Sequence, residues 1–141
     1  MREHMGLFRG KRIDNGEWVE GFYIAHLNAA HYIIPCRTGG YAAMDDSFYV
    51  HRWYEVDPDT VGECTSLRDK NGKLIFEGDI FRSDSTLMIV ATGAVHYADG
   101  GWCVNNDFLQ AFMWGGEVRG EIIGNVHDNP ELLKGGEVDG D

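Results

Sequence analysis

Two carboxylates on either side of a glycine, Glu77 and Asp79 in the segment EGDI, are the first candidates for chemistry. A pair of carboxyl groups held close together can divide the roles of general acid and general base. The same spacing suits a tight bend, because Gly78 can adopt backbone angles closed to other residues and Asp79 can accept hydrogen bonds from nearby amides. The bend is the simpler interpretation, so we predict no catalytic residue here.

The histidines and cysteines provide one further pair. His96 and Cys103 stand on opposite sides of a predicted hairpin, so their side chains could approach as two zinc ligands do. His26 and His31 are five residues apart, which is not the interval of neighbouring positions on one helix face. Cross-strand neighbours are usually packing partners only, and we therefore predict neither a metal site nor a cofactor.

Nucleophilic catalysis and phosphate binding lack their usual sequence patterns. No serine stands in a GxSxG context, and Cys36 has only Arg37 as a basic neighbour. The glycine pairs are not part of a GxxxxGK[ST] motif and suit hairpin turns better. An enzyme that uses Glu77, Asp79, His96 or Cys103 remains an alternative without a supporting motif.

Aromatic residues give a different kind of candidate. In the run SFYVHRWYEVD, strand alternation places Tyr49, His51 and Trp53 on one face, where they could contact a ligand, a partner or a second subunit. Burial of both faces is the competing interpretation, because aromatic-rich strands often pack into a core. With two tryptophans farther along the chain, the predicted partner-binding residues are Tyr49, His51, Trp53, Trp102 and Trp114.

The charge of the chain constrains its partners. With 23 acidic and 12 basic residues the formal net charge is −11, and the densest basic group is only Arg9, Lys11 and Arg12. DNA binding normally depends on many Lys and Arg contacts to phosphates, so direct nucleic-acid binding is disfavoured. An acidic surface could instead mimic DNA or bind a basic protein, or it could serve solubility alone.

Short runs of aromatic and β-branched residues between glycine-containing turns indicate a mainly β protein with minor helix. We expect a hairpin over 7–24 that turns at Asp14-Asn15-Gly16, and another that turns at Asp99-Gly100-Gly101. The apolar run 86–92 predicts a central strand. Residues 105–114 are ambiguous, since their apolar spacing is helical, and 128–133 should form a capped helical turn.

These strands are expected to build one domain, residues 1–133. Its N-terminal hairpin part covers about 6–56, and about 66–128 should form an SH3-like barrel or half-barrel of short antiparallel strands. The acidic segment 134–141 is expected to be disordered. The absence of a long apolar segment, an apparent signal peptide or a disulfide pattern makes a cytoplasmic location the default expectation.

Three stretches resemble the YopX proteins of bacterial phages and prophages. They are FRGKRIDNGEWVEGF, VDPDTVGECTSLRDKNGKLIFEGDIFR and EIIGNVHDNPELL, and together they span nearly the whole chain from Leu7 to Leu133. One departure falls at Cys64-Thr65-Ser66, where family members often carry an aromatic residue, Thr and Gly. The resemblance implies a compact, largely β fold and a mobile-element origin. It implies no established activity and no catalytic residues.

Three hypotheses about function follow. The leading one is a non-enzymatic protein-interaction or self-assembling module of phage or prophage origin, acting in the cytoplasm of a bacterial host cell. The first alternative is an acidic mimic of DNA that inhibits a host nucleic-acid enzyme. The second alternative is an enzyme of unknown reaction.

Overall fold

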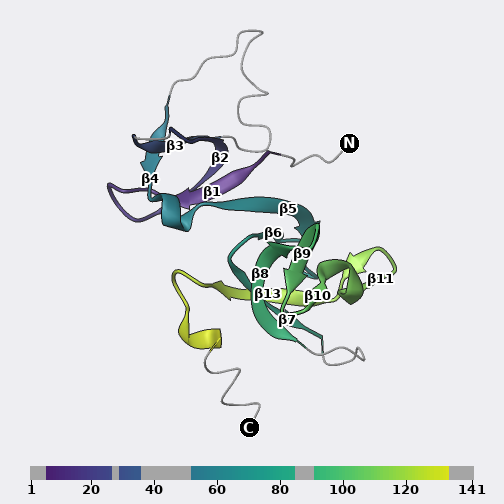
Figure 1. Cartoon of the computed structure of the whole chain (residues 1–141). Helices are drawn as coiled ribbons and strands as arrows, with labels where there is room; N and C mark the ends of the chain where they lie inside the picture. Colours follow the sequence, from purple (N-terminus) through teal and green to yellow (C-terminus); the bar gives the residue numbers. More distant parts are fainter. Residues whose placement is uncertain (1–5, 27–28, 36–51, 85–90, 134–141) are drawn as a thin grey trace. The chain divides into compact units, whose positions relative to one another are not determined.

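A computed structural model describes residues 6–26, 29–35, 52–84 and 91–133 of the chain. The prediction of a mainly β protein is confirmed (Figure 1). All sheets are antiparallel, and they are not closed into a barrel. The chain separates into two compact units, residues 4–64 and residues 65–141, and each is described by itself.

The first unit is a sheet of short strands that begins with the predicted hairpin. Its strands are β1 (Phe8–Lys11), β2 (Trp18–Ile24), β3 (His31–Pro35), β4 (Tyr54–Val56) and the beginning of β5 (Gly62–Arg68), in the order β4-β3-β2-β1-β5. The turn after β1 uses Gly16 at φ 73°, and the Asn15 side chain accepts a hydrogen bond from the Glu17 amide. Glycine meets the need for a positive φ at this turn without strain.

The inner face of this sheet packs around Ile33 and Val56, which are fully buried. Gly10 lies against them so closely that a Cβ there would be 3.2 Å from Val56. Beyond β1 the chain continues along β4, where Ile13 N–H donates to the Glu55 carbonyl at 3.0 Å. A short 3₁₀ helix, η2 (Pro58–Thr60), lies after β4, and Asp57 caps it, since its carboxylate accepts a hydrogen bond from the Asp59 amide.

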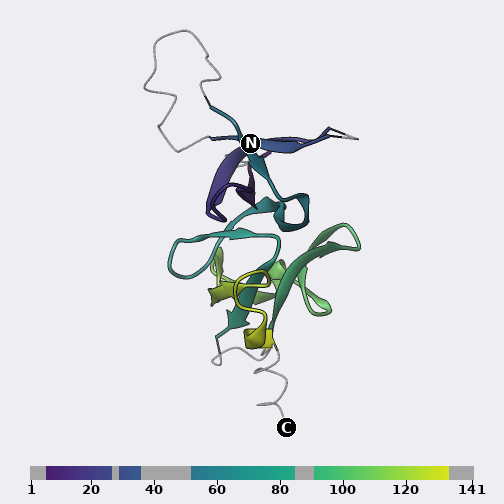
Figure 2. The same ribbon diagram turned by 90° about the vertical axis from the view of Figure 1, so that its left-hand side faces the viewer.

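The second unit contains the end of β5 and the remaining strands (Figures 1 and 2). Its principal sheet has the order β10-β9-β8-β7-β13, and β6 pairs with β5. The elements are β6 (Leu74–Phe76), β7 (Asp79–Ser83), β8 (Thr92–Ala98), β9 (Gly101–Val104), β10 (Asp107–Phe108), η3 (Leu109–Phe112), β11 (Met113–Trp114), β12 (Glu117–Val118) and β13 (Gly120–Asn125). β11 and β12 form a separate two-stranded ribbon.

A single apolar cluster holds this unit together. Phe81 and Phe112 lie at its centre with ring centroids 5.4 Å apart, and Ile75, Val95 and Leu109 pack around them. All five side chains are fully buried. Burial of a large apolar side chain contributes about 1.5–3 kcal/mol, so this cluster is a principal source of stability in the unit.

The ambiguous segment 105–114 is not an α-helix. It contains β10, the single 3₁₀ turn η3 and β11, with Asn105 at φ 56° before them. The three-residue spacing of Leu109 and Phe112 brings both side chains to the core, which explains the helical spacing in the sequence.

Near the end of the chain the predicted helical turn is confirmed by a hydrogen bond from the Leu132 amide to the Asn129 carbonyl. The predicted strand 86–92 lies largely outside the described residues.

Candidate functional site

The carboxylate of Asp79 belongs to a turn. The side chain is 1% exposed, and its Oδ2 accepts a hydrogen bond from the Phe76 amide at 2.7 Å. Gly78 has φ 91°, and its amide donates to the Val95 carbonyl at 2.9 Å. The bend interpretation of EGDI is therefore confirmed: Asp79 fixes the connection from β6 to β7.

Asp69, in the DKNG turn, has a similar role that the sequence reasoning missed. It is buried, and its Oδ1 accepts from the amides of Asn71 and Lys73, each at 2.9 Å. Its Oδ2 accepts from the Ile122 amide at 2.9 Å, on the edge strand β13. An open strand edge invites pairing with another chain, and Asp69 occupies a donor on this one. A sequence of the form Asp-x-x-Gly signals the turn, but nothing in it points to Ile122.

His96 and Cys103 do face one another, as the predicted hairpin required. They are directly opposed in the antiparallel pair of β8 and β9. His96 Nδ1 lies 3.1 Å from the Ala94 carbonyl oxygen, and the Cys103 thiol donates towards the carbonyl oxygen of Ala98 at 3.5 Å. Among the described residues no third metal-binding side chain joins them.

The predicted partner-binding aromatic residues belong to both units. Trp53 is 58% exposed beside β4 in the first unit, whereas Trp102 and Trp114 belong to the second unit. Trp114 is 66% exposed on β11, and Trp102 is half-buried against the core. Tyr49 and His51 lie outside the described residues. The described strand β4 contains only Tyr54–Val56 of the aromatic run, so its proposed two-faced arrangement is not tested.

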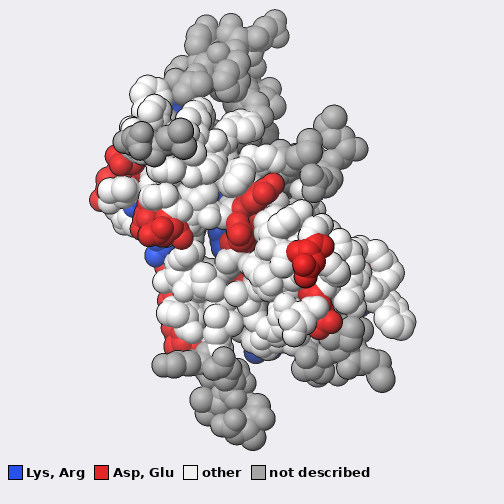
Figure 3. Space-filling model, in the orientation of Figure 1, with Lys and Arg blue, Asp and Glu red and all other residues white. Residues whose placement is uncertain are grey.

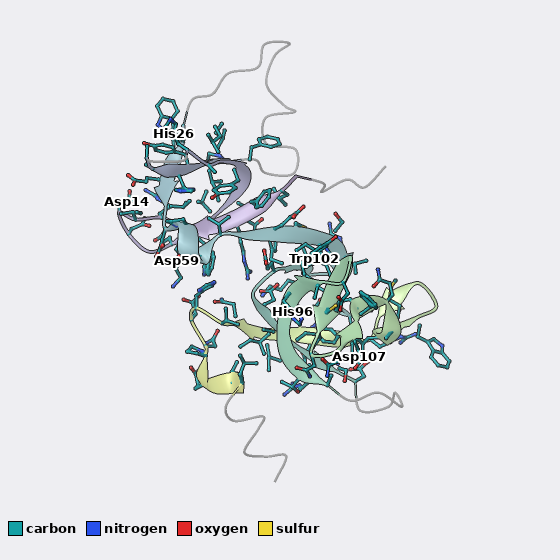
Figure 4. The ribbon with its side chains drawn as sticks, viewed as in Figure 1. Asp14, His26, Asp59, His96, Trp102 and Asp107 are labelled. Carbon is teal, nitrogen blue, oxygen red and sulfur yellow. The ribbon has the colours of Figure 1, made fainter. Side chains whose placement is uncertain are left out.

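The hairpin of β8 and β9 carries a pair of aromatic rings of which the sequence reasoning identified only one. Tyr97 lies opposite Trp102, and the two rings meet edge to face with centroids 5.2 Å apart. Tyr97 is 59% exposed, while Trp102 is anchored on the apolar cluster (Figure 4). Asp99 at φ 53° and Gly100 at φ 85° form the two-residue turn, the backbone pattern of a tight hairpin. Alternation from that predicted turn could have paired Tyr97 with Trp102.

Trp18 and Tyr54, in the first unit, have cations of the same unit against their rings. The Arg9 guanidinium lies 4.7 Å from the centre of the Trp18 ring, and Lys11 Nζ lies 5.5 Å from it. The guanidinium of Arg12 is 4.0 Å from the Tyr54 ring and also contacts Asp14 at 2.6 Å. This hydrogen bond to Asp14 raises the pKa of Arg12 and lowers the pKa of the Asp14 carboxyl.

The hairpin rings of the second unit have a different electrostatic environment. From Ser83 to Val118 the sequence contains four acidic residues and neither lysine nor arginine. Within the described residues no cation lies over Tyr97 or Trp102. Figure 3 shows acidic atoms over this part of the surface among uncharged ones, with no basic atom beside them. We call Tyr97, Asp99, Trp102 and Asp107 the hairpin surface.

The family model for YopX protein matches residues 7–134 of the chain. The chain belongs to the YopX family. A solved structure with a similar fold, described as the crystal structure of protein EF1440 from Enterococcus faecalis, has a TM-score of 0.56 and 23% sequence identity. That similarity covers 89% of this YopX-family chain and 96% of the other chain. No curated protein is significantly similar to the chain. The part of this YopX-family protein that the structure describes has no helix long and apolar enough to cross a membrane.

Proposed function

We propose that this YopX-family protein is a non-enzymatic protein-interaction module of phage or prophage origin that acts in the cytoplasm of a bacterial host. The observation that carries the proposal is the exposed Tyr97 ring, held edge-on against the core-anchored Trp102. Aromatic side chains with fixed orientation provide much of the binding energy at protein interfaces and lose little conformational freedom on binding. The tight hairpin and the apolar cluster hold Trp102 in place before any partner arrives.

The state of the acidic side chains supports an interaction role over catalysis by the EGDI segment. Asp79 is buried and accepts from the Phe76 amide, so it is held in the turn and away from solvent. A general acid or base must reach its substrate within hydrogen-bonding distance. Asp69 is likewise committed to three backbone amides. Asp69 and Asp79 thus stabilise the fold through hydrogen bonds to backbone amides.

The DNA-mimic alternative receives less support. A mimic must present its carboxylates to the partner, but several of them are paired within the protein. Asp84 binds Lys70 at 2.9 Å, and Glu121 binds Arg82 at 2.8 Å. On the face drawn in Figure 3, the acidic atoms form separate groups with uncharged atoms between them.

The interaction proposal can be tested by affinity capture from a nuclease-treated bacterial lysate. The bait is the full-length chain, compared with Tyr97→Ser and with Trp53→Ser as a control that removes an exposed aromatic side chain from the other unit. The proposal predicts a stoichiometric protein that the wild type and Trp53→Ser retain and Tyr97→Ser loses. Sedimentation of the bait alone detects self-association through the same surface. A folded bait that neither captures a protein nor self-associates in a Tyr97-dependent manner contradicts the proposal.

A further inference from the structure

The hairpin surface has two features that together restrict what it can bind. The first is the aromatic pair, since Tyr97 and Trp102 lie side by side on neighbouring strands and Tyr97 is mostly exposed. The second is its charge. Asp99 is exposed in the turn two residues beyond Tyr97, and no ion pair within the described residues neutralises it. Both features favour a cation.

Asp107 is placed beside the same pair by the strand register. It lies opposite Val104 on the strand next to β9, so it is diagonal to Trp102 across the sheet. Diagonal neighbours of this kind are about 7–8 Å apart at their Cα atoms, within reach of a long side chain. Figure 4 labels Trp102 and Asp107, which lie on β9 and β10. Asp99, in the turn, and Asp107, on β10, therefore occupy register positions on either side of Trp102 along the strand direction.

In the first unit the cations nearest to the Trp18 and Tyr54 rings are guanidinium groups, while Lys11 Nζ lies farther from the Trp18 ring, at 5.5 Å. Arg9 and Arg12 each place a guanidinium within 5 Å of the centre of an aromatic ring, and Arg12 contacts a carboxylate at the same time. A planar guanidinium can stack on an aromatic ring while its N–H groups bind an adjacent carboxylate, which a lysine ammonium does less well. The hairpin surface has the rings and the carboxylates of this arrangement but lacks the arginine.

We infer that the hairpin surface binds an arginine-bearing segment of a partner protein. The guanidinium stacks on Tyr97 and Trp102, and Asp99 and Asp107 accept hydrogen bonds from it or from a neighbouring arginine. This inference rests on the proposed function and specifies the chemistry of the partner. The ligand is a protein segment, because an exposed ring with carboxylates at separate positions suits an arginine side chain carried by a polypeptide. The net charge of −11 disfavours nucleic acid.

Fluorescence anisotropy with a labelled peptide tests the inference. The probe is a short peptide with three arginines among glycines and serines, titrated with the full chain at about 0.05 M and about 0.3 M NaCl, where screening differs strongly. We expect saturable binding that weakens with salt. A peptide with citrulline at the three positions has the same shape without the charge, and we expect it to bind at least about fivefold more weakly. A lysine peptide should bind between these two.

Variants separate specific recognition from general attraction to an acidic protein. Tyr97→Ser leaves the charge unchanged, and we expect it to weaken arginine-peptide binding about three- to fivefold. Asp99→Asn should weaken it about twofold, whereas Trp53→Ser and Asp59→Asn, matched changes in the first unit, should not affect it. Circular dichroism melts establish that each variant is folded.

Three results would overturn the inference: equal binding of the citrulline peptide, an effect of Asp59→Asn as large as that of Asp99→Asn, or no binding of the arginine peptide. These results are distinguishable from failure of the proposed function. If lysate capture remains dependent on Tyr97 while the arginine peptide does not bind, the interaction role stands and the arginine partner is wrong. If neither assay depends on Tyr97, both proposals fail.

Discussion

Two pairs of aromatic rings, one pair in each unit, differ in what lies against them. In the first unit Trp18 and Tyr54 are covered by arginine and lysine side chains from β1 and the residue after it. In the second unit Tyr97 and Trp102 contact one another, and the 36 residues from Ser83 to Val118 contain no arginine or lysine. Rings that already hold cations contribute to the fold, while we propose that rings beside carboxylates that pair with no cation among the described residues are available to a partner. Exposure of an aromatic residue alone does not make this distinction.

Asp69 and Asp79, in the DKNG and EGDI turns, stabilise the second unit and are not offered to a partner in our proposal. Asp69→Ala should then have the largest effect, because it removes the acceptor of three backbone amides in a buried site. Each buried donor left without a partner costs about 1–3 kcal/mol, and solvent entry offsets part of this. We expect a loss of about 3 kcal/mol in the free energy of unfolding, measured by urea denaturation.

Asp59→Ala is the control for this experiment. Asp59 is exposed in η2, and its removal should change the free energy of unfolding by less than about 0.5 kcal/mol. If Asp69→Ala were as stable as Asp59→Ala, the structural role of the DKNG carboxylate would be wrong.

A direct test of the comparison replaces one ring in each unit. Trp18→Ser removes the ring that Arg9 and Lys11 cover, and we expect a loss of about 2 kcal/mol from the lost cation–π contacts and apolar burial. Tyr97→Ser removes a mostly exposed ring and should cost less than about 0.5 kcal/mol. Thermal and urea unfolding measure both. Equal losses would remove the distinction between rings that stabilise the fold and rings available to a partner.

Ser66 should give a smaller effect of the opposite sign. It has φ 68°, a left-handed conformation that is costly for a residue with a Cβ. Ser66→Gly should therefore stabilise the protein by about 0.5–1 kcal/mol. Ser83→Gly makes the same chemical change where the hydroxyl accepts from the Ala91 amide at 2.7 Å, and it should be destabilising. A lower melting temperature for Ser66→Gly would contradict the backbone explanation.

The smallest effect concerns the ion pair between Arg82 on β7 and Glu121 on β13. The hydrogen bond from Arg82 lowers the pKa of Glu121 below its usual value of 4.5. A carboxyl group with a lowered pKa in the folded state stabilises the protein above its unfolded-state pKa, and this contribution is lost as the pH falls through the folded-state pKa. Glu121→Gln should thus reduce the difference in melting temperature between pH 6 and pH 3 slightly. An unchanged or larger difference would show that the pair does not contribute.

Local patterns in the sequence were sufficient to predict several turns of the second unit. The hairpin at Asp99-Gly100, the bend at Gly78 and the helical turn after Asn129 all follow from turn chemistry within a few residues. Segment 105–114 could not be assigned in this way, because the spacing of Leu109 and Phe112 fits both an α-helix and a single 3₁₀ turn. Only packing against the core decides between them.

The candidate site was harder to predict from the sequence, because the contacts and exposure of its side chains depend on residues far apart in the chain. The approach of His96 to Cys103 followed from the hairpin, whereas the bond from Ile122 to Asp69 joins positions far apart in the chain. Tyr97 was missed although its pairing with Trp102 follows from the hairpin register. What the sequence could not supply is that cations lie against Trp18 and Tyr54, whereas Tyr97 is left mostly exposed.

The most direct test of the hairpin surface is an NMR titration of the ¹⁵N-labelled full chain with the arginine peptide. Amide and indole resonances then report separately on each unit. We predict shifts concentrated between Val95 and Phe108, with the Trp102 indole N–H among the largest and the Trp18 and Trp53 indoles unchanged. Shifts that follow acidic residues throughout both units, or that centre on the first unit, would contradict the assignment of recognition to this hairpin.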